Sequence, residues 1–145
     1  MRVVFLSLDE VLALHADQIA RYGGSPGIRD MGLLDSALAM PRATFGGRWL
    51  HESLHEMAAA YLFHLVQGHA FIDGNKRVGL MAMLAFLGLN SVRVDATETE
   101  LVGLVLGVAT GRVSKAEVAV FLQRHTVHGG GRGLGAVSYP PSRHS

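Results

Sequence analysis

The stretch Gln67–Leu89, QGHAFIDGNKRVGLMAMLAFLGL, decides how the rest of the chain can be arranged. Its second part, Val78 to Leu89, is an uncharged apolar run of 12 residues. A membrane-spanning helix needs about 20 apolar residues. This run therefore predicts a helix buried inside a protein core, and no contact with a membrane is expected. Its first part places five polar or charged side chains within nine residues, where that helix begins.

Helix signals recur on both sides of this stretch. Three serine or threonine residues precede a glutamate three positions later, the pattern of a capping box, and they are Ser7, Thr97 and Ser114. Asp30 predicts the cap of a short helix that stops before Pro41. The predicted helices cover residues 8–22, 31–40, 52–67 and 76–89, with two more that end near Gly111 and His125.

The remaining segments predict little regular structure. Residues 41–50 contain two glycines and predict a loop, whereas residues 91–95, SVRVD, predict one short β pairing with residues 2–6, RVVFL. We therefore expect an all-α domain over residues 1–126, with about six helices around a buried central helix. Residues 127–145 are rich in glycine, proline and serine and predict a flexible tail.

Composition limits the classes of function. The 145 residues suffice for one domain, and the formal net charge is only +1. Residues 1–125 carry 11 basic and 12 acidic groups, so no direct contact with nucleic acid is expected. The absence of cysteine excludes disulfides and cysteine-based zinc sites. Acidic residues soon after the N-terminus do not fit a signal peptide, and a cytoplasmic location is expected.

The polar part of the opening stretch has the features of a phosphate site. Backbone N–H groups at a helix N-terminus are unpaired and lie at the positive end of the helix dipole, where they bind anions. Gly74 can adopt positive φ and let the backbone approach a ligand. Lys76 and Arg77 add cationic donors where phosphate oxygens would lie. Basic residues are disfavoured in a first helical turn by the dipole, which favours the presence of an anionic ligand.

Two further residues could complete a transfer site. Asp73 offers a hard oxygen ligand that suits Mg²⁺, and His69 could accept a proton from an attacking hydroxyl near neutral pH. Together these groups are the parts of a phosphoryl- or nucleotidyl-transfer site. Each also has a plainer interpretation, because Asp73 could cap the following helix and His69 could be an ordinary loop residue. The hypothesis rests on their occurrence together in one loop.

Residues 69–77, HAFIDGNKR, resemble the motif H-x-F-x-(D/E)-x-N-(K/G)-R of the Fic/Doc family. Residues 14–38 and 102–122 resemble the first part and the last helices of death-on-curing (Doc) toxins. The resemblance thus covers roughly residues 6–125. It implies the compact helical bundle of the Fic/Doc type.

The family contains two chemistries. Fic enzymes transfer AMP from ATP to a protein hydroxyl, whereas Doc toxins transfer the γ-phosphate to elongation factor Tu and arrest translation. Lys76 stands where the Fic motif has glycine, and Leu80 stands where it has a second arginine. Both differences favour the Doc branch, although Gly74 is Fic-like. The resemblance therefore implies a kinase toxin acting on an elongation factor Tu-like protein, with AMP transfer as the alternative.

The resemblance also implies roles for single residues. His69 would be the base and Asp73 would hold Mg²⁺, and with Lys76 and Arg77 they would form the catalytic set. The phosphates of ATP would be bound by Gly74, Asn75, Lys76 and Arg77. Fic proteins often carry an inhibitory (S/T)-x-x-x-E-(G/N) string, which this sequence lacks. An inhibitor in trans is therefore implied, namely a small Phd-like antitoxin.

Two other hypotheses remain open. Residues 51–55, HESLH, match H-E-x-x-H, in which His51 and His55 would bind zinc from one helix face and Glu52 would be the base. Asp73 could be offered as a third ligand. Against the zinc hypothesis, no metzincin histidine follows, because that position holds Tyr61. The other hypothesis is a non-catalytic binding module that keeps the fold alone.

Overall fold

The all-α prediction is confirmed by the computed structural model, which describes residues 2–128. The helices are α1 (Leu8–Tyr22), α2 (Met31–Ala39), the 3₁₀ turn η1 (Met40–Arg42), α3 (Leu54–Gly68), α4 (Asn75–Leu89), α5 (Glu98–Ala109) and α6 (Lys115–Arg124). The strands are β1 (Thr44–Phe45), β2 (Arg48–Trp49), β3 (Val92–Val94) and β4 (Thr126–His128). In this part of the chain, no helix has the length and apolar character needed to cross a membrane.

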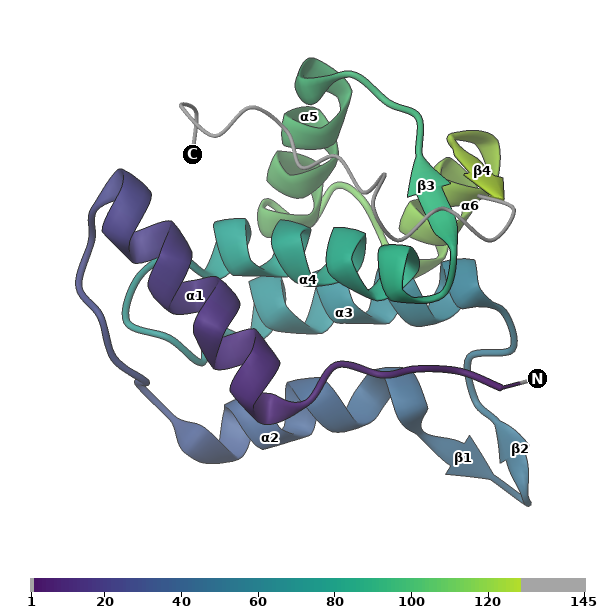
Figure 1. Ribbon diagram of the computed structural model, residues 1–145, viewed down its shortest axis with the longest axis horizontal. Helices are drawn as coiled ribbons and strands as arrows, with labels where there is room; N and C mark the ends of the chain where they lie inside the picture. Colours follow the sequence, from purple (N-terminus) through teal and green to yellow (C-terminus); the bar gives the residue numbers. More distant parts are fainter. Residues whose placement is uncertain (1, 129–145) are drawn as a thin grey trace.

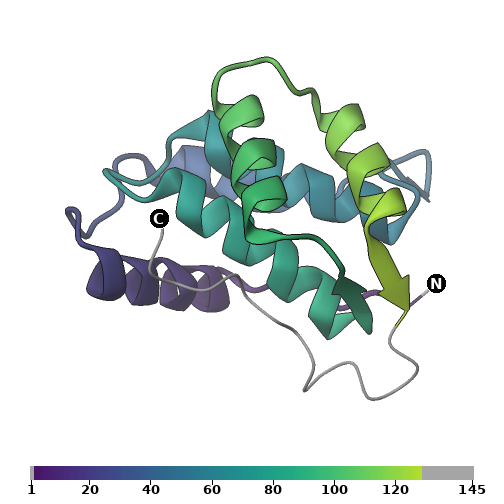
Figure 2. The same ribbon diagram turned by 90° about the horizontal axis from the view of Figure 1, so that it is seen from above.

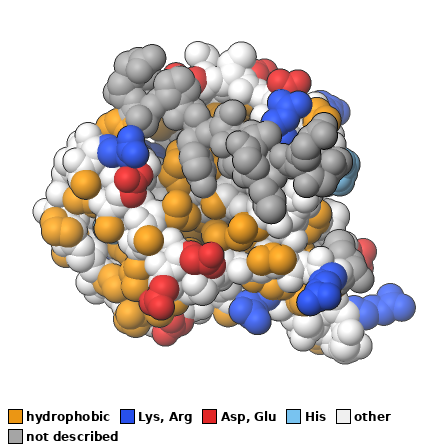
Figure 3. Space-filling model, viewed as in Figure 1, with side chains coloured by type: hydrophobic (Ala, Val, Ile, Leu, Met, Phe, Trp, Pro, Cys, Tyr) orange, Lys and Arg blue, Asp and Glu red, His pale blue; other side chains and the backbone are white. Residues whose placement is uncertain are grey.

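Helices α3 and α4 form the centre of the molecule. Figure 1 shows α2 and the β1–β2 hairpin on one side of this pair, and α5, α6 and the β3–β4 pair on the other. Figure 2 shows α1 lying along a third side. Helix α4 is buried at eleven of its fifteen positions, as the apolar run predicts for a central helix. Figure 3 shows hydrophobic side chains on one face of the molecule, although the large ones of α1 and α4 are buried or half-buried.

Five of the six α-helices in residues 2–128 begin with a side-chain cap. In each, a serine, threonine or aspartate accepts a hydrogen bond from a backbone N–H in the first turn, and these residues are Ser7, Asp30, Ser53, Thr97 and Ser114. Four of these caps were predicted. The predicted start of α3 at Glu52 was wrong, because Ser53 and Glu56 form a capping box and the helix begins at Leu54.

The predicted pairing of residues 91–95 with the N-terminus was also wrong. Strand β3 pairs antiparallel with β4, with Arg93 opposite Val127. The N-terminal segment instead binds the side chain of Asn90, which accepts from the Val4 N–H at 2.9 Å and donates to the Val4 carbonyl at 2.8 Å. One amide side chain thus occupies both backbone groups that a strand partner would have used.

Two loop predictions need smaller corrections. Residues 44–49, predicted as loop, form a hairpin whose two-residue turn is Gly46–Gly47. Both glycines have positive φ, as the type I′ turn of tight hairpins requires. The predicted tail began at residue 127, but β4 continues to His128. The remainder of that predicted tail, residues 129–145, lies outside the described residues.

The seam between α3 and α6 contains a histidine that resists protonation. His64 on α3 accepts a hydrogen bond from the Lys115 ammonium at 3.1 Å. Burial, reinforced by the nearby charges of Lys115 and His51, lowers the pKa of His64 to about 4. A neutral imidazole in this seam is therefore the form that the fold selects.

We expect this histidine to make the protein less stable in acid. The ordinary histidine pKa is 6.5 and the folded value is about 4, so the unfolded chain binds more protons between these pH values. The free energy of unfolding should fall as pH drops through that window. His64→Gln should reduce the slope, measured as melting temperature against pH, with the exposed His69→Gln as the control. Equal slopes for His64→Gln and the wild type would contradict this.

A second prediction concerns the contact between α3 and α4. A Cβ atom added at Gly79 would lie 2.8 Å from Val66 Cγ2 and 3.3 Å from the Leu62 carbonyl, so the helices would have to separate. We expect Gly79→Ala to lower the free energy of unfolding by about 1–3 kcal/mol, measured by urea denaturation. Gly103→Ala on α5 is the control, because nothing lies within 4 Å of its Cβ. That control should be neutral or stabilising.

Candidate functional site

The loop between α3 and α4 is held against the segment that joins α1 to α2. Its Ala70 carbonyl accepts from the N–H groups of Arg29 at 2.7 Å and Asp30 at 3.0 Å. Its Ile72 N–H donates to the Gly27 carbonyl at 3.2 Å, and Phe71 forms an isolated antiparallel bridge with Ile28. The loop is thus held by a segment about forty residues earlier in the chain.

Asn75 closes the loop from within. Its side-chain oxygen accepts from the Phe71 N–H and its side-chain nitrogen donates to the Phe71 carbonyl, both at 3.0 Å. The Asn75 side chain is only 9% exposed, and that of Phe71 is 1% exposed. Sequence reasoning assigned Asn75 to phosphate binding. Because the side-chain amide of Asn75 is hydrogen-bonded to Phe71, phosphate binding by this residue would use its backbone N–H.

His15 on α1 packs against the α3–α4 loop and hydrogen-bonds to it. The sequence analysis did not predict this role. Its ring is stacked on Phe71 with 3.8 Å between centroids, and its Nε2 donates to the Asp73 carbonyl at 2.7 Å. His15 is 4% exposed. The available signal was a histidine on the apolar face of the first helix, one turn after the buried Val11.

The Asp73 carboxylate is exposed to solvent, but a hydrogen bond holds it in one orientation. Its Oδ2 accepts from the Ser25 N–H at 2.8 Å. A Cβ atom at Gly24 would come within 3.2 Å of the Asp73 Cβ, so the glycine admits this close approach. No group of three histidine, cysteine or acidic side chains in residues 2–128 could hold a metal ion. Mg²⁺ commonly uses one or two carboxylates together with substrate phosphates, and Asp73 fits that simpler requirement.

Arg77 ties the start of α4 to the end of α1. Its Nη1 donates to the Gln18 carbonyl at 3.0 Å, and its Nη2 donates to the Gly23 carbonyl at 3.1 Å. Its guanidinium also lies over the Tyr22 ring, 5.8 Å from the centroid. The phosphate role predicted for Arg77 stays a prediction, and the guanidinium has in addition this structural one. Lys76, its neighbour, is exposed.

The N-terminus of α4 differs from the other five in the described residues. Its N-cap is Gly74, at φ 82°, and no side chain accepts from the first turn. The first turn contains no acidic residue and holds Lys76 and Arg77. Unpaired N–H groups, the positive end of the dipole and a lysine therefore coincide, and this arrangement attracts an anion.

His69 lies at the other end of the loop, as the C-cap of α3. Its backbone is left-handed, with φ 49° and ψ 45°, and its side chain is exposed. One exposed loop thus presents an imidazole, the Asp73 carboxylate and the Lys76 ammonium around a helix N-terminus. Such a loop can accept a proton, hold a hard cation and bind phosphate.

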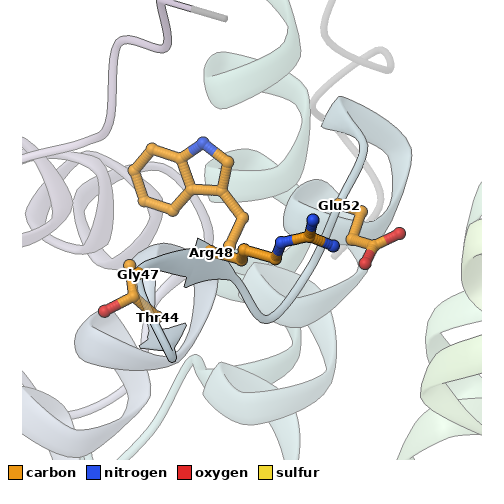
Figure 4. Close-up of a pocket in the computed structure, with 5 residues that line it drawn as sticks. Thr44, Gly47, Arg48 and Glu52 are labelled. Atoms are coloured by element: carbon orange, nitrogen blue, oxygen red, sulfur yellow. The ribbon is translucent and has the colours of Figure 1, made fainter.

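The H-E-x-x-H sequence does not form the helical motif of a zinc protease. His51 and Glu52 precede α3, so the helix that would align His51 with His55 is absent there. Glu52 lines a hollow of about 510 Å³ with Arg48 of the hairpin (Figure 4). The hairpin lies at the end of the molecule opposite the α3–α4 loop (Figure 1). His55 Nε2 is bound to Thr126 Oγ1 at 2.8 Å. His51, Glu52 and His55 therefore do not form one zinc site.

Comparisons with known proteins agree on one family. The model of the Fic/DOC family matches residues 5–87, which include the whole α3–α4 loop. The protein kinase doc of Escherichia phage P1 is 39% identical over 119 residues, which cover 82% of this chain and 93% of that protein. The toxin Doc of Mycolicibacterium smegmatis is 44% identical over 89 residues, which cover 61% of this chain and 68% of that protein.

The structure predicts that Asn75 is a stability residue before it is a ligand. Asn75→Ala would leave the buried Phe71 N–H and carbonyl without partners, at a cost of about 1–3 kcal/mol. We expect urea denaturation to show that loss and hydrogen exchange to show faster exchange of the Phe71 amide. Lys76→Ala, an exposed neighbour, should change neither quantity. Unchanged exchange at Phe71 in Asn75→Ala would contradict the role.

Proposed function

The chain belongs to the Doc branch of the Fic/Doc family, and from this premise we propose that it is a kinase toxin of a toxin–antitoxin pair. In this proposal it transfers the γ-phosphate of ATP to a hydroxyl of an elongation factor Tu-like protein and so arrests translation. The names of the two relatives, a protein kinase and a toxin, support both parts. The observation that carries the proposal is the uncapped N-terminus of α4 inside the loop of residues 69–77.

Two positions favour phosphate transfer over AMP transfer. Leu80 occupies the place of the second Fic arginine, and its side chain is 8% exposed and packed in the core. A cationic phosphate ligand is therefore missing from that place. Lys76, where the Fic motif has glycine, adds an exposed ammonium in the first turn of α4. Gly74 favours the alternative, since the Fic motif has glycine there too.

In the proposed step, the residues of the loop move one proton and neutralise charge. His69 takes the proton from the target hydroxyl as its oxygen bonds to the γ-phosphorus. The bond between that phosphorus and the β–γ bridging oxygen breaks, and ADP leaves. Lys76 and the N–H groups of the first turn of α4 bind phosphate oxygens. Asp73 would hold Mg²⁺, which when bound neutralises phosphate charge.

The proposed partner is a small antitoxin of the Phd kind. The sequence has no inhibitory Fic string, so inhibition would come from another chain. The hydrophobic side chains that Figure 3 shows on one face of the molecule offer an apolar surface that such a chain could cover. The proposed location is the cytoplasm, because ATP and the translation factor are found there.

Labelled ATP distinguishes the two chemistries. The purified protein is incubated with elongation factor Tu and Mg²⁺, with either γ-³²P- or α-³²P-labelled ATP. We expect label on the target from γ-labelled ATP alone. Label from α-labelled ATP would establish AMP transfer instead. No label on any of a tested range of targets would favour the binding module.

The same assay tests the base. We expect His69→Ala to lower the rate of transfer by about 10²-fold or more, the range typical of general-base catalysis. The variant should melt at the wild-type temperature, since the His69 side chain is exposed. His128→Ala, another exposed histidine outside the loop, is the matched control and should keep full activity. Substantial transfer by His69→Ala would refute its assignment as the base.

A further inference from the structure

The C-terminus of α3 is terminated in an unusual way. Helices often end at a left-handed glycine, but here the left-handed residue is His69, which follows Gly68. His69 is one of two non-glycine residues within 2–128 that have positive φ, a conformation that costs an L-residue about 1 kcal/mol. The last turn of α3 contains no basic residue to interact with its terminal carbonyls. Something outside the helix must therefore stabilise this end.

Arg29, from the connection between α1 and α2, supplies that stabilisation. Its Nε donates to the His69 carbonyl at 2.7 Å, and its Nη2 reaches the Gly68 carbonyl at 3.4 Å. Its backbone N–H donates to the Ala70 carbonyl at 2.7 Å. One residue thus contacts three consecutive carbonyls and places a positive charge at the negative end of α3.

We propose that Arg29 is a positioning residue that acts through His69 and sets the direction of its imidazole. The inference rests on the proposed function, in which His69 is the base. Its contacts fix the peptide groups on both sides of His69. The backbone direction of the Cα–Cβ bond is then set, and only rotation about the side-chain bonds remains. A base must lie within hydrogen-bond reach of the proton that it removes, so a small reorientation is costly.

The geometry separates this role from two others. The Arg29 guanidinium is directed at carbonyls of α3, whereas the anion-attracting groups lie at the N-terminus of α4. If Arg29 bound ATP, its loss would raise the KM for ATP. If it only stabilised the fold, its loss would lower the melting temperature and leave kcat unchanged at temperatures well below melting. A positioning residue instead lowers kcat with little change in KM.

The kinetic experiment uses three variants of the full chain. We expect Arg29→Ala to lower kcat for phosphate transfer about tenfold and to leave the KM for ATP within about twofold. Arg29→Lys should recover part of kcat, because lysine keeps the positive charge but lacks the planar guanidinium whose Nε and Nη2 donate to the two carbonyls. Arg21→Ala is the matched control. Arg21 is an exposed arginine whose ion pair with Asp17, at 2.9 Å, lies within α1.

A second readout does not depend on activity. With ¹³C-labelled histidine, the ring signal of His69 reports its surroundings by NMR. We expect that signal and the backbone shifts of residues 68–70 to move in Arg29→Ala and to stay in place in Arg21→Ala. An unmoved His69 signal, an unchanged kcat or a raised KM for ATP would each overturn the role of Arg29.

Failure of the proposed function has a different signature. A wild-type protein that transfers nothing to any target overturns the kinase proposal and, with it, a positioning role in that reaction. An active wild type with a fully active Arg29→Ala overturns the role of Arg29 alone.

Discussion

The docking of the α3–α4 loop onto the α1–α2 connection is the constraint on which the site depends. Asn75 closes the loop through both backbone groups of the buried Phe71, and Ala70 and Ile72 bond to residues 27–30. These bonds lie at the end of the central helix pair, so they also determine where α1 and α2 pack. Loss of the loop geometry would therefore disturb the first two helices as well as the chemistry.

The residues of the 69–77 loop have separate roles that their spacing did not predict. Asn75 and Phe71 form the frame, and Arg77 holds the end of α1 through two carbonyls. His69, Asp73 and Lys76 present their side chains to solvent. A site for a highly charged substrate needs exposed charges held at fixed positions, and the frame supplies that preorganisation. Some of the polar residues thus stabilise the fold, and others remain exposed for the proposed reaction.

Helix α4 combines two properties that normally exclude one another. It is buried on nearly all sides, yet its first turn is uncapped and basic. The other five α-helices in residues 2–128 satisfy their first turn with a local side chain. Leaving these donors open costs stability, and the burial of the rest of the helix offsets that cost. The exception to the capping rule falls in the loop of residues 69–77, to which the proposed function assigns the reaction, and function is expected to override local stability at such a place.

The sequence by itself determined the helices, four of their five side-chain caps and the position of the loop. Capping boxes join residues three positions apart. A 12-residue apolar run can be recognised without knowing which residues pack against it. Both are therefore local signals. Only the tertiary structure decided that Asn90 binds Val4 and leaves β3 to pair with β4. Only the tertiary structure also showed that His15 donates to the Asp73 carbonyl and Arg29 donates to the His69 carbonyl. These contacts join residues 40 to 86 positions apart, and their geometry exists only after α1 and α2 have packed against the central pair.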